Sequence, residues 1–178
     1  WSLASHPHSS ILVSGSADST IRVWDIGVED SSRLSIEVTP IVTSTGMEIP
    51  LVSPTPVFLS FEQRNQKRFH CATSSGNFFL FDLEKQAVVY QCQVATEEAQ
   101  IATGTALECV STHAILPIAY CGMGDGSIKV IDTTSGKVVQ DEAAHHGPVT
   151  TIDVHSSGLI FSSAGVDGVV RLWDTTSL

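Results

Sequence analysis

Three residues near the end of the chain have the side-chain types that acyl-transfer chemistry uses: His145, Ser163 and Asp167. A serine hydroxyl becomes a nucleophile when a histidine takes its proton and an aspartate orients that histidine. Such a site also needs an exposed hydroxyl, an oxyanion hole and a substrate cleft. The role of the three residues therefore depends on the elements that position them.

Asp167 belongs to a spacing that occurs three times. In each case an Asp lies 12 positions after a His and seven positions before a second Asp. The three sets are His6, Asp18 and Asp25; His113, Asp125 and Asp132; and His155, Asp167 and Asp174. Two independent spacings that agree three times indicate an internal repeat, which is sought before any other feature of a sequence.

A fourth copy lies between the first and second of these sets. The stretch TSSGNFFLFD, residues 73–82, has the same ending but carries Ser75 where the turn Asp would stand. The four closing Asp residues are separated by 57, 50 and 42 residues. The last interval is close to the roughly 40–45 residues of a four-stranded propeller blade, and the longer intervals predict insertions.

Side chains alternate within each repeat. In TIRVWD, residues 20–25, Ile21 and Val23 share one face while Arg22 and Trp24 share the other, which is the period of a β-strand. Gly, Asp and Ser occupy the turns, as tight hairpins require. The sequence predicts an all-β chain of four-stranded antiparallel sheets. The expected sheets span residues 1–45, 54–95, 104–143 and 147–178, the last without its outer strand.

The motifs GSADSTIRVWD, AGVDGVVRLWD and AHHGPV resemble those of the WD-repeat β-propeller family, and the resemblance covers essentially the whole chain. The order of features, including FFLFDLEKQAVV and STHAILPIAYCGMGDGSIKVIDTTSGKVV, is most similar to the propeller of striatin-type scaffold proteins. The family usually forms rings of seven blades. Because the chain starts at Trp1 and has four repeats, we expect it to be a fragment of a longer propeller.

The resemblance also implies a role for His145, Ser163 and Asp167, the three residues that could form an acyl-transfer site. In the family a hydrogen-bonded tetrad lies inside a blade, and the matching residues in the last repeat are His145, Ser163, Asp167 and Trp173. The first repeat offers a partial set, Ser14, Asp18 and Trp24. A network of this kind satisfies buried polar groups, so we interpret it as structural and expect no catalytic residue.

The histidine and cysteine patterns argue against metal and cofactor binding. His6 recurs as His113 and His155 at one place in the repeat, which favours a structural role for this histidine over metal ligation. The four cysteines, Cys71, Cys92, Cys109 and Cys121, form no C-x-x-C motif. We therefore expect buried free thiols, no metal and no cofactor, and a reducing, cytoplasmic location.

Charge and hydropathy argue against a nucleic-acid partner and against a membrane-spanning helix. The net charge is −10, with 19 acidic residues against 9 Lys and Arg and no basic stripe, so a nucleic-acid surface is not expected. No apolar run approaches the roughly 20 residues of a membrane-spanning helix.

We therefore expect a protein–protein interaction scaffold and not an enzyme. The striatin-type resemblance implies a cytoplasmic scaffold that brings protein phosphatase 2A together with kinases, with the propeller as a docking platform. Alternatives are another WD-repeat adaptor or regulatory subunit with a different partner, and a propeller enzyme, since fold alone does not decide function. The open ends of a propeller fragment could also support self-association.

In WD-repeat propellers, partners often bind the face that carries the turns between second and third strands and the loops entering the first strands. On this chain that face would present Trp1, Ala17, Ser19, Met123, His146, Thr150 and Val166. Trp1 and Met123 are the expected anchors, because large apolar side chains at an exposed rim often carry binding energy. Alternatively, Trp1 packs against a blade outside this chain.

Phe79 breaks the alternation of its strand. It takes the place that Arg22, Lys129 and Arg171 hold in the other repeats, so its strand has apolar side chains on both faces. Either a neighbouring insertion covers Phe79 or the side chain forms part of a contact patch. We expect the insertion to cover it.

Overall fold

The computed structural model describes residues 2–27, 32–37, 55–62, 65–94 and 107–176. The regular elements in these ranges are strands. The first sheet contains β1 (Ser2–Ser5), β2 (Ile11–Gly15), β3 (Thr20–Asp25) and β4 (Ser32–Glu37). The second contains β5 (Pro56–Phe61), β6 (Arg68–Thr73), β7 (Asn77–Asp82) and β8 (Ala87–Gln93).

The third sheet contains β9 (Leu107–Thr112), β10 (Ile118–Met123), β11 (Ser127–Asp132) and β12 (Lys137–Ala143). The fourth contains β13 (Val149–Val154), β14 (Ile160–Gly165) and β15 (Val170–Asp174). Within every sheet the strands pair antiparallel and in chain order. Each sheet is therefore a meander, and we call the four sheets blades one to four.

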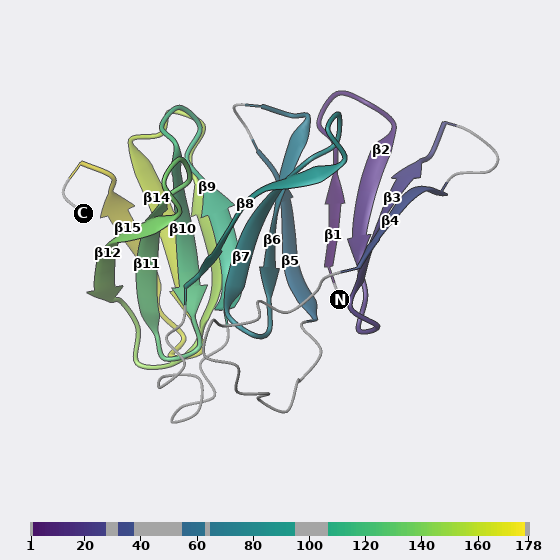
Figure 1. Cartoon of the computed structure of the whole chain (residues 1–178). Helices are drawn as coiled ribbons and strands as arrows, with labels where there is room; N and C mark the ends of the chain where they lie inside the picture. The colour runs from purple at the N-terminus through teal and green to yellow at the C-terminus, as the bar shows by residue number, and fades with distance from the viewer. Residues whose placement is uncertain (1, 28–31, 38–54, 63–64, 95–106, 177–178) are drawn as a thin grey trace.

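The blades stand side by side in an arc (Figure 1). Successive blades meet through their first strands, because β1 contacts β5, β5 contacts β9, and β9 contacts β13. The turns between first and second strands lie at the upper edge in Figure 1, and those between second and third strands lie at the lower edge. This architecture confirms the predicted all-β propeller fold with four blades.

Apolar side chains fill the three junctions between neighbouring blades. Ile21 and Val23 of blade one pack with Phe79 and Phe81 of blade two in the first junction. The second junction buries Phe78 against Leu107, Val110 and Ile131, and the third buries Val149 and Phe161 against Ile128. One buried free cysteine lies in each junction cluster, namely Cys71, Cys121 and Cys109 in that order, and the half-buried Cys92 packs against the second cluster.

Phe79 is covered and forms no exposed contact patch. It is 4% exposed and packs against blade one in the first junction cluster, while the insertions expected to cover it lie outside the described residues. A strand in the middle of the arc has a blade on both faces. Apolar residues on both faces therefore mark a doubly covered strand here, as they do in parallel sheets.

The last blade has a different environment on its two faces. Trp173 packs toward the third junction, whereas Ile160, Val170 and Leu172 point the other way and are exposed. We call these three residues the far face. No helix within the described ranges is long and apolar enough to cross a membrane.

Candidate functional site

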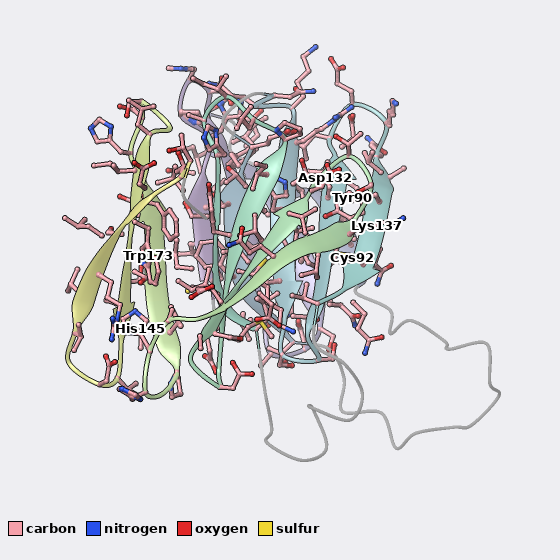
Figure 2. All side chains as sticks on the ribbon, turned by 90° about the vertical axis from the view of Figure 1, so that its left-hand side faces the viewer. Tyr90, Cys92, Asp132, Lys137, His145 and Trp173 are labelled. Carbon is pink, nitrogen blue, oxygen red and sulfur yellow. The ribbon has the colours of Figure 1, made fainter. Side chains whose placement is uncertain are left out.

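The four residues of the candidate tetrad come from four successive parts of blade four. His145 precedes β13, Ser163 lies on β14, Asp167 lies in the turn between β14 and β15, and Trp173 lies on β15. Figure 2 labels two of them, His145 and Trp173, in blade four. The structure brings all four side chains together.

The distances define one connected network. Nδ1 of His145 lies 3.1 Å from both carboxylate oxygens of Asp167, and Nε2 lies 2.8 Å from Oγ of Ser163. The indole N–H of Trp173 donates to the same Oγ at 2.8 Å. Because a carboxylate can only accept, Nδ1 carries the proton of the imidazole. Nε2 of a neutral ring then accepts from the Ser163 hydroxyl.

Asp167 is held as a carboxylate by the donors around it. Removal from water opposes its ionisation, but the backbone N–H groups of His146 and Val169 and the ring of His145 outweigh this. The pKa of Asp167 is lowered to about 2 as a result. Both backbone hydrogen bonds are 3.1 Å long: the one from His146 ties the turn to the loop before β13, and the one from Val169 lies within the turn.

The network does not present a nucleophile. Ser163 is 1% exposed, its hydroxyl donates to His145, and its oxygen accepts from Trp173. A serine that attacks a substrate must instead be reachable from a cleft. The arrangement satisfies buried polar groups and ties together two strands, the turn between them and the loop before β13.

The other blades contain partial versions of this network. In blade one the indole of Trp24 donates to Ser14 Oγ at 2.8 Å, while Asp18 accepts from the backbone and hydroxyl of Thr20. These Thr20 hydrogen bonds lower the pKa of Asp18. In blade three Asp125 likewise accepts from Ser127, and Ile131 is buried where Trp173 stands in blade four.

The recurring histidine fixes the turn between first and second strands. The ring nitrogen Nδ1 accepts a backbone N–H in each case: from His8 onto His6, from Leu116 onto His113, and from Ser157 onto His155. His113 goes further, because its Nε2 lies 2.8 Å from the carbonyl oxygen of Gly158 in the next blade. The spacing of His113 in the sequence indicated a structural role but did not predict this link between blades three and four.

Blade two carries a carboxylate at the same place. The backbone N–H of Glu62 bonds to the carbonyl of Arg68, just as that of His6 bonds to Ile11 and that of His113 bonds to Ile118. Glu62 is thus the structural equivalent of the recurring histidine. The sequence held a signal for this, namely the missing histidine in the second repeat.

The predicted docking residues lie in different environments. Trp1 lies outside the described residues. Ala17, His146, Thr150 and Val166 are exposed, and Ser19 is half-buried with a φ of 66°. They come from blades one and four, at the edge with the turns between second and third strands.

Met123 is not an exposed anchor, and this expectation was wrong. Its side chain is 0% exposed and packs in the second junction with Ala72 and Leu107. The pairing of β10 with β9 shifts by one residue between Gly122 and Met123, so Met123 pairs with Leu107. Gly15 and Thr73 end the second strands of blades one and two and are buried as well.

No group of three or more His, Cys, Asp or Glu side chains among the described residues could hold a metal ion. The four cysteines are free thiols, with Cys92 half-buried and the others buried. Burial raises the pKa of all four thiols, to about 12 for Cys109.

Comparison with known proteins agrees with this geometry. The family model described as "WD domain, G-beta repeat" matches residues 1–25 and 136–174, which include the partial network of blade one and the complete one of blade four. These two segments match the WD repeat, and the chain is similar to striatins. This confirms the resemblance that the sequence motifs indicated.

The striatin relatives align along nearly the whole chain. A striatin homolog from Dictyostelium discoideum is 27% identical over 179 residues, covering 99% of this chain and 20% of the relative. Human striatin-4 is 28% identical over 174 residues, covering 97% and 21%. Mouse striatin is 28% identical over 181 residues, covering 99% and 21%. The chain spans about a fifth of the length of the curated relatives it matches.

Proposed function

We propose that this chain is a non-catalytic protein-interaction scaffold, and that partners dock on the edge formed by the turns between second and third strands. The observation that carries the proposal is Val166, an apolar side chain that is 61% exposed on a turn fixed at several points. An exposed apolar side chain on a rigid support is typical of the residues that dominate binding energy at interfaces.

The rigidity of this turn comes from named contacts. The backbone N–H of Val166 donates to the carbonyl of Pro148 at 3.0 Å, and Asp167 accepts from the backbone of His146. A side chain at Gly147 would come within 2.7 Å of the Val166 Cγ2 atom. The turn and the loop before β13 thus form one preorganised surface, which loses little conformational entropy on binding.

The likeness to striatins supports a finer proposal. We place the chain in a cytoplasmic assembly of the kind that striatin-type scaffolds organise, with protein phosphatase 2A and kinases among the partners. Similarity over 97–99% of this chain supports the choice. The free cysteines agree with a reducing compartment.

The test compares two exposed valines. Val166→Asp places a charge on the proposed docking edge, and Val88→Asp places one on the outer strand β8, where Val88 is 48% exposed. Wild type and Val88→Asp should retain the same partners in affinity capture followed by mass spectrometry, phosphatase and kinase subunits included. Val166→Asp should lose them with unchanged thermal unfolding. Equal capture by both variants would overturn the docking edge.

A further inference from the structure

Two turns between first and second strands carry exposed aliphatic side chains. In blade three Ile115 is 62% and Leu116 is 49% exposed, and in blade four Leu159 is 62% exposed. These turns lie at the upper edge in Figure 1, opposite the proposed docking edge. We call the three residues the aliphatic patch. Large aliphatic side chains that gather on one surface of a soluble protein often mark an interaction site.

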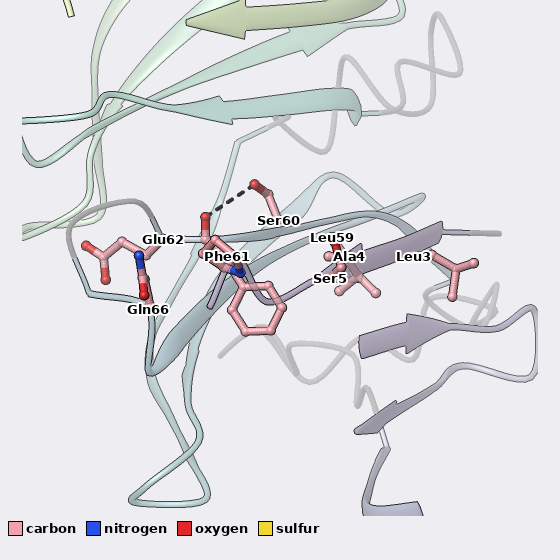
Figure 3. A pocket seen from close by; sticks show the side chains of 9 residues that line it. Leu3, Ala4, Ser5, Leu59, Ser60, Phe61, Glu62 and Gln66 are labelled. Atoms are coloured by element: carbon pink, nitrogen blue, oxygen red, sulfur yellow. Dashed lines mark hydrogen bonds between the residues drawn. The ribbon is translucent and has the colours of Figure 1, made fainter. Parts of the chain in front are cut away.

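The corresponding turns of blades one and two are polar. In blade one the turn consists of residues 7–10, PHSS. In blade two it includes Gln66 and begins beside Glu62, and Figure 3 shows both side chains together with Phe61. The repeat fold therefore forms without aliphatic residues in these turns, and fold stability does not account for them in blades three and four.

His113 joins the two aliphatic turns into one surface. Its Nδ1 atom accepts the backbone N–H groups of Ile115 and Leu116, at 3.0 and 2.9 Å. The proton of the neutral ring is therefore on Nε2, which donates to the carbonyl oxygen of Gly158 at 2.8 Å. Leu159 directly follows Gly158. One buried imidazole ring thus holds both halves of the aliphatic patch in place.

The backbone of the patch is already hydrogen-bonded within the chain. Besides the N–H group described above, the carbonyl of Leu116 is used, because it accepts from the backbone of Ile118 at 2.9 Å. The carbonyl of Leu159 accepts from the backbone of Thr175 at 3.0 Å, and its N–H donates to the Ser157 hydroxyl at 3.3 Å. Strand addition needs free backbone groups, so a partner has to bind here through side chains, as a helix does in a groove.

The half of the chain that carries the patch is acidic. Residues 107–176 contain eight Asp and Glu against three Lys and Arg. Lys129 is ion-paired with Asp141, and Arg171 is half-buried. Lys137 is thus the one exposed Lys or Arg among the described residues of this half. Asp132 pairs with the strand that leaves the blade-three turn, and neutral donors in its own turn lower its pKa. This surface favours a basic partner.

We propose that the aliphatic patch binds a short amphipathic helix of a partner polypeptide, with Lys or Arg beside the apolar face of that helix. The apolar face would cover Ile115, Leu116 and Leu159, and the basic residues would face the acidic surface of blades three and four. The inference rests on the proposed scaffold function and adds a second surface at the other edge of the arc.

The experiment titrates the intact chain with synthetic peptides of leucine and lysine. One peptide has its leucines at helical spacing, and a second of the same composition alternates the two residues and favours a strand. A third is the helical peptide with glutamate in place of lysine. In ¹H–¹⁵N NMR titrations at constant ionic strength, the helical lysine peptide should shift the amides of Leu116 and Leu159 saturably. It should bind at least about fivefold more tightly than the other two. Equal binding of the three peptides, or no saturable shift at these amides, would overturn the inference.

Two matched pairs of variants at exposed positions locate the surface. Ile115→Ser should weaken binding of the helical lysine peptide at least about fivefold. Ile26→Ser, at an isoleucine of blade one that is 69% exposed, should change it less than about twofold. Leu159→Ser should weaken binding in the same way, whereas Leu172→Ser on the far face should not. Unchanged binding by both Ile115→Ser and Leu159→Ser, or a loss only in Leu172→Ser, would contradict the assignment.

The outcomes separate this inference from the proposed function. If Val166→Asp abolishes partner capture while the helical lysine peptide fails to bind, the scaffold proposal stands and the helix-binding patch is wrong. If the peptide binds at Leu116 and Leu159 but the chain captures no partner, the chemistry of the patch stands and the scaffold proposal is wrong.

Discussion

The third strands of blades one and four have nearly the same sequence and opposite surroundings. Ile21 and Val23 are 0% and 3% exposed in the first junction, whereas Val170 and Leu172 on the far face are 70% and 76% exposed. The strands have the same alternation and the same Trp-Asp ending. The difference shows that the strand pattern specifies two faces, while the neighbouring blade decides which of them becomes core.

The largest difference in the free energy of unfolding should appear when one apolar side chain is truncated in the first junction and its counterpart is truncated on the far face. Ile21→Ala removes a filled position in the first junction and should lower the free energy of unfolding by about 2–5 kcal/mol. Leu172→Ala on the far face should change it by less than about 0.5 kcal/mol. Urea unfolding followed by fluorescence measures both. Similar losses for the two variants would mean that the far face is covered in solution.

Two glycines with the same backbone conformation, one at the third junction and one in open space, separate the effect of the junction from backbone strain. Gly158 and Gly168 have φ values of 71° and 74°, so alanine at either position is strained by about 1–2 kcal/mol. A side chain at 158 would also come within 2.5 Å of the His113 ring, while one at 168 meets nothing within 4 Å.

Gly158→Ala should therefore cost about 1–3 kcal/mol more than Gly168→Ala. Thermal unfolding of the two variants tests this. Equal stability of the two variants would show that the third junction accommodates the added methyl group beside His113 at little cost in free energy.

The complete network of blade four and the partial network of blade one should differ less in their contribution to stability. Ser163→Ala leaves the Trp173 indole and His145 without their shared partner in a site where Ser163 is 1% exposed, and should cost about 1–3 kcal/mol. In blade one Ser14 itself is half-buried, so water can replace its hydroxyl at the Trp24 indole. Ser14→Ala should cost less than about 1 kcal/mol, and a larger loss than for Ser163→Ala in urea unfolding would reverse the comparison.

The smallest effect concerns a histidine inside the second blade. Burial lowers the pKa of His70 to about 3, and neither ring nitrogen has a hydrogen-bond partner within the described residues. The unfolded chain, with a histidine pKa near 6.5, binds the proton first, so this group removes stability as pH falls from 6.5 toward 3.

Between pH 7.5 and 5.5 the loss from His70 should be about 1 kcal/mol. His70→Leu should reduce this pH dependence in urea unfolding at the two pH values. An unchanged pH slope in His70→Leu would show that His70 is protonated in the folded chain.

Much of the fold was predictable because turn residues and alternation are local properties. The spacing of His155, Asp167 and Asp174 predicted a strand, a turn and a strand, and the family motif indicated which residues meet at Ser163. Contacts between blades were less predictable. The burial of Met123 depends on blade two, which packs against it in the second junction, and that of Phe79 depends on blade one in the first junction. Neither is encoded within the strand itself.

The cysteines have a practical consequence for this kind of protein. Cys71, Cys121 and Cys109 each lie in a different junction, and burial both shields them and keeps their thiols protonated. A maleimide reagent can therefore reach each one only when its own junction opens. Each of the three junctions therefore contains a natural cysteine whose labelling reports its opening. Labelling rates resolved by mass spectrometry would rank the three junctions by how readily each one separates.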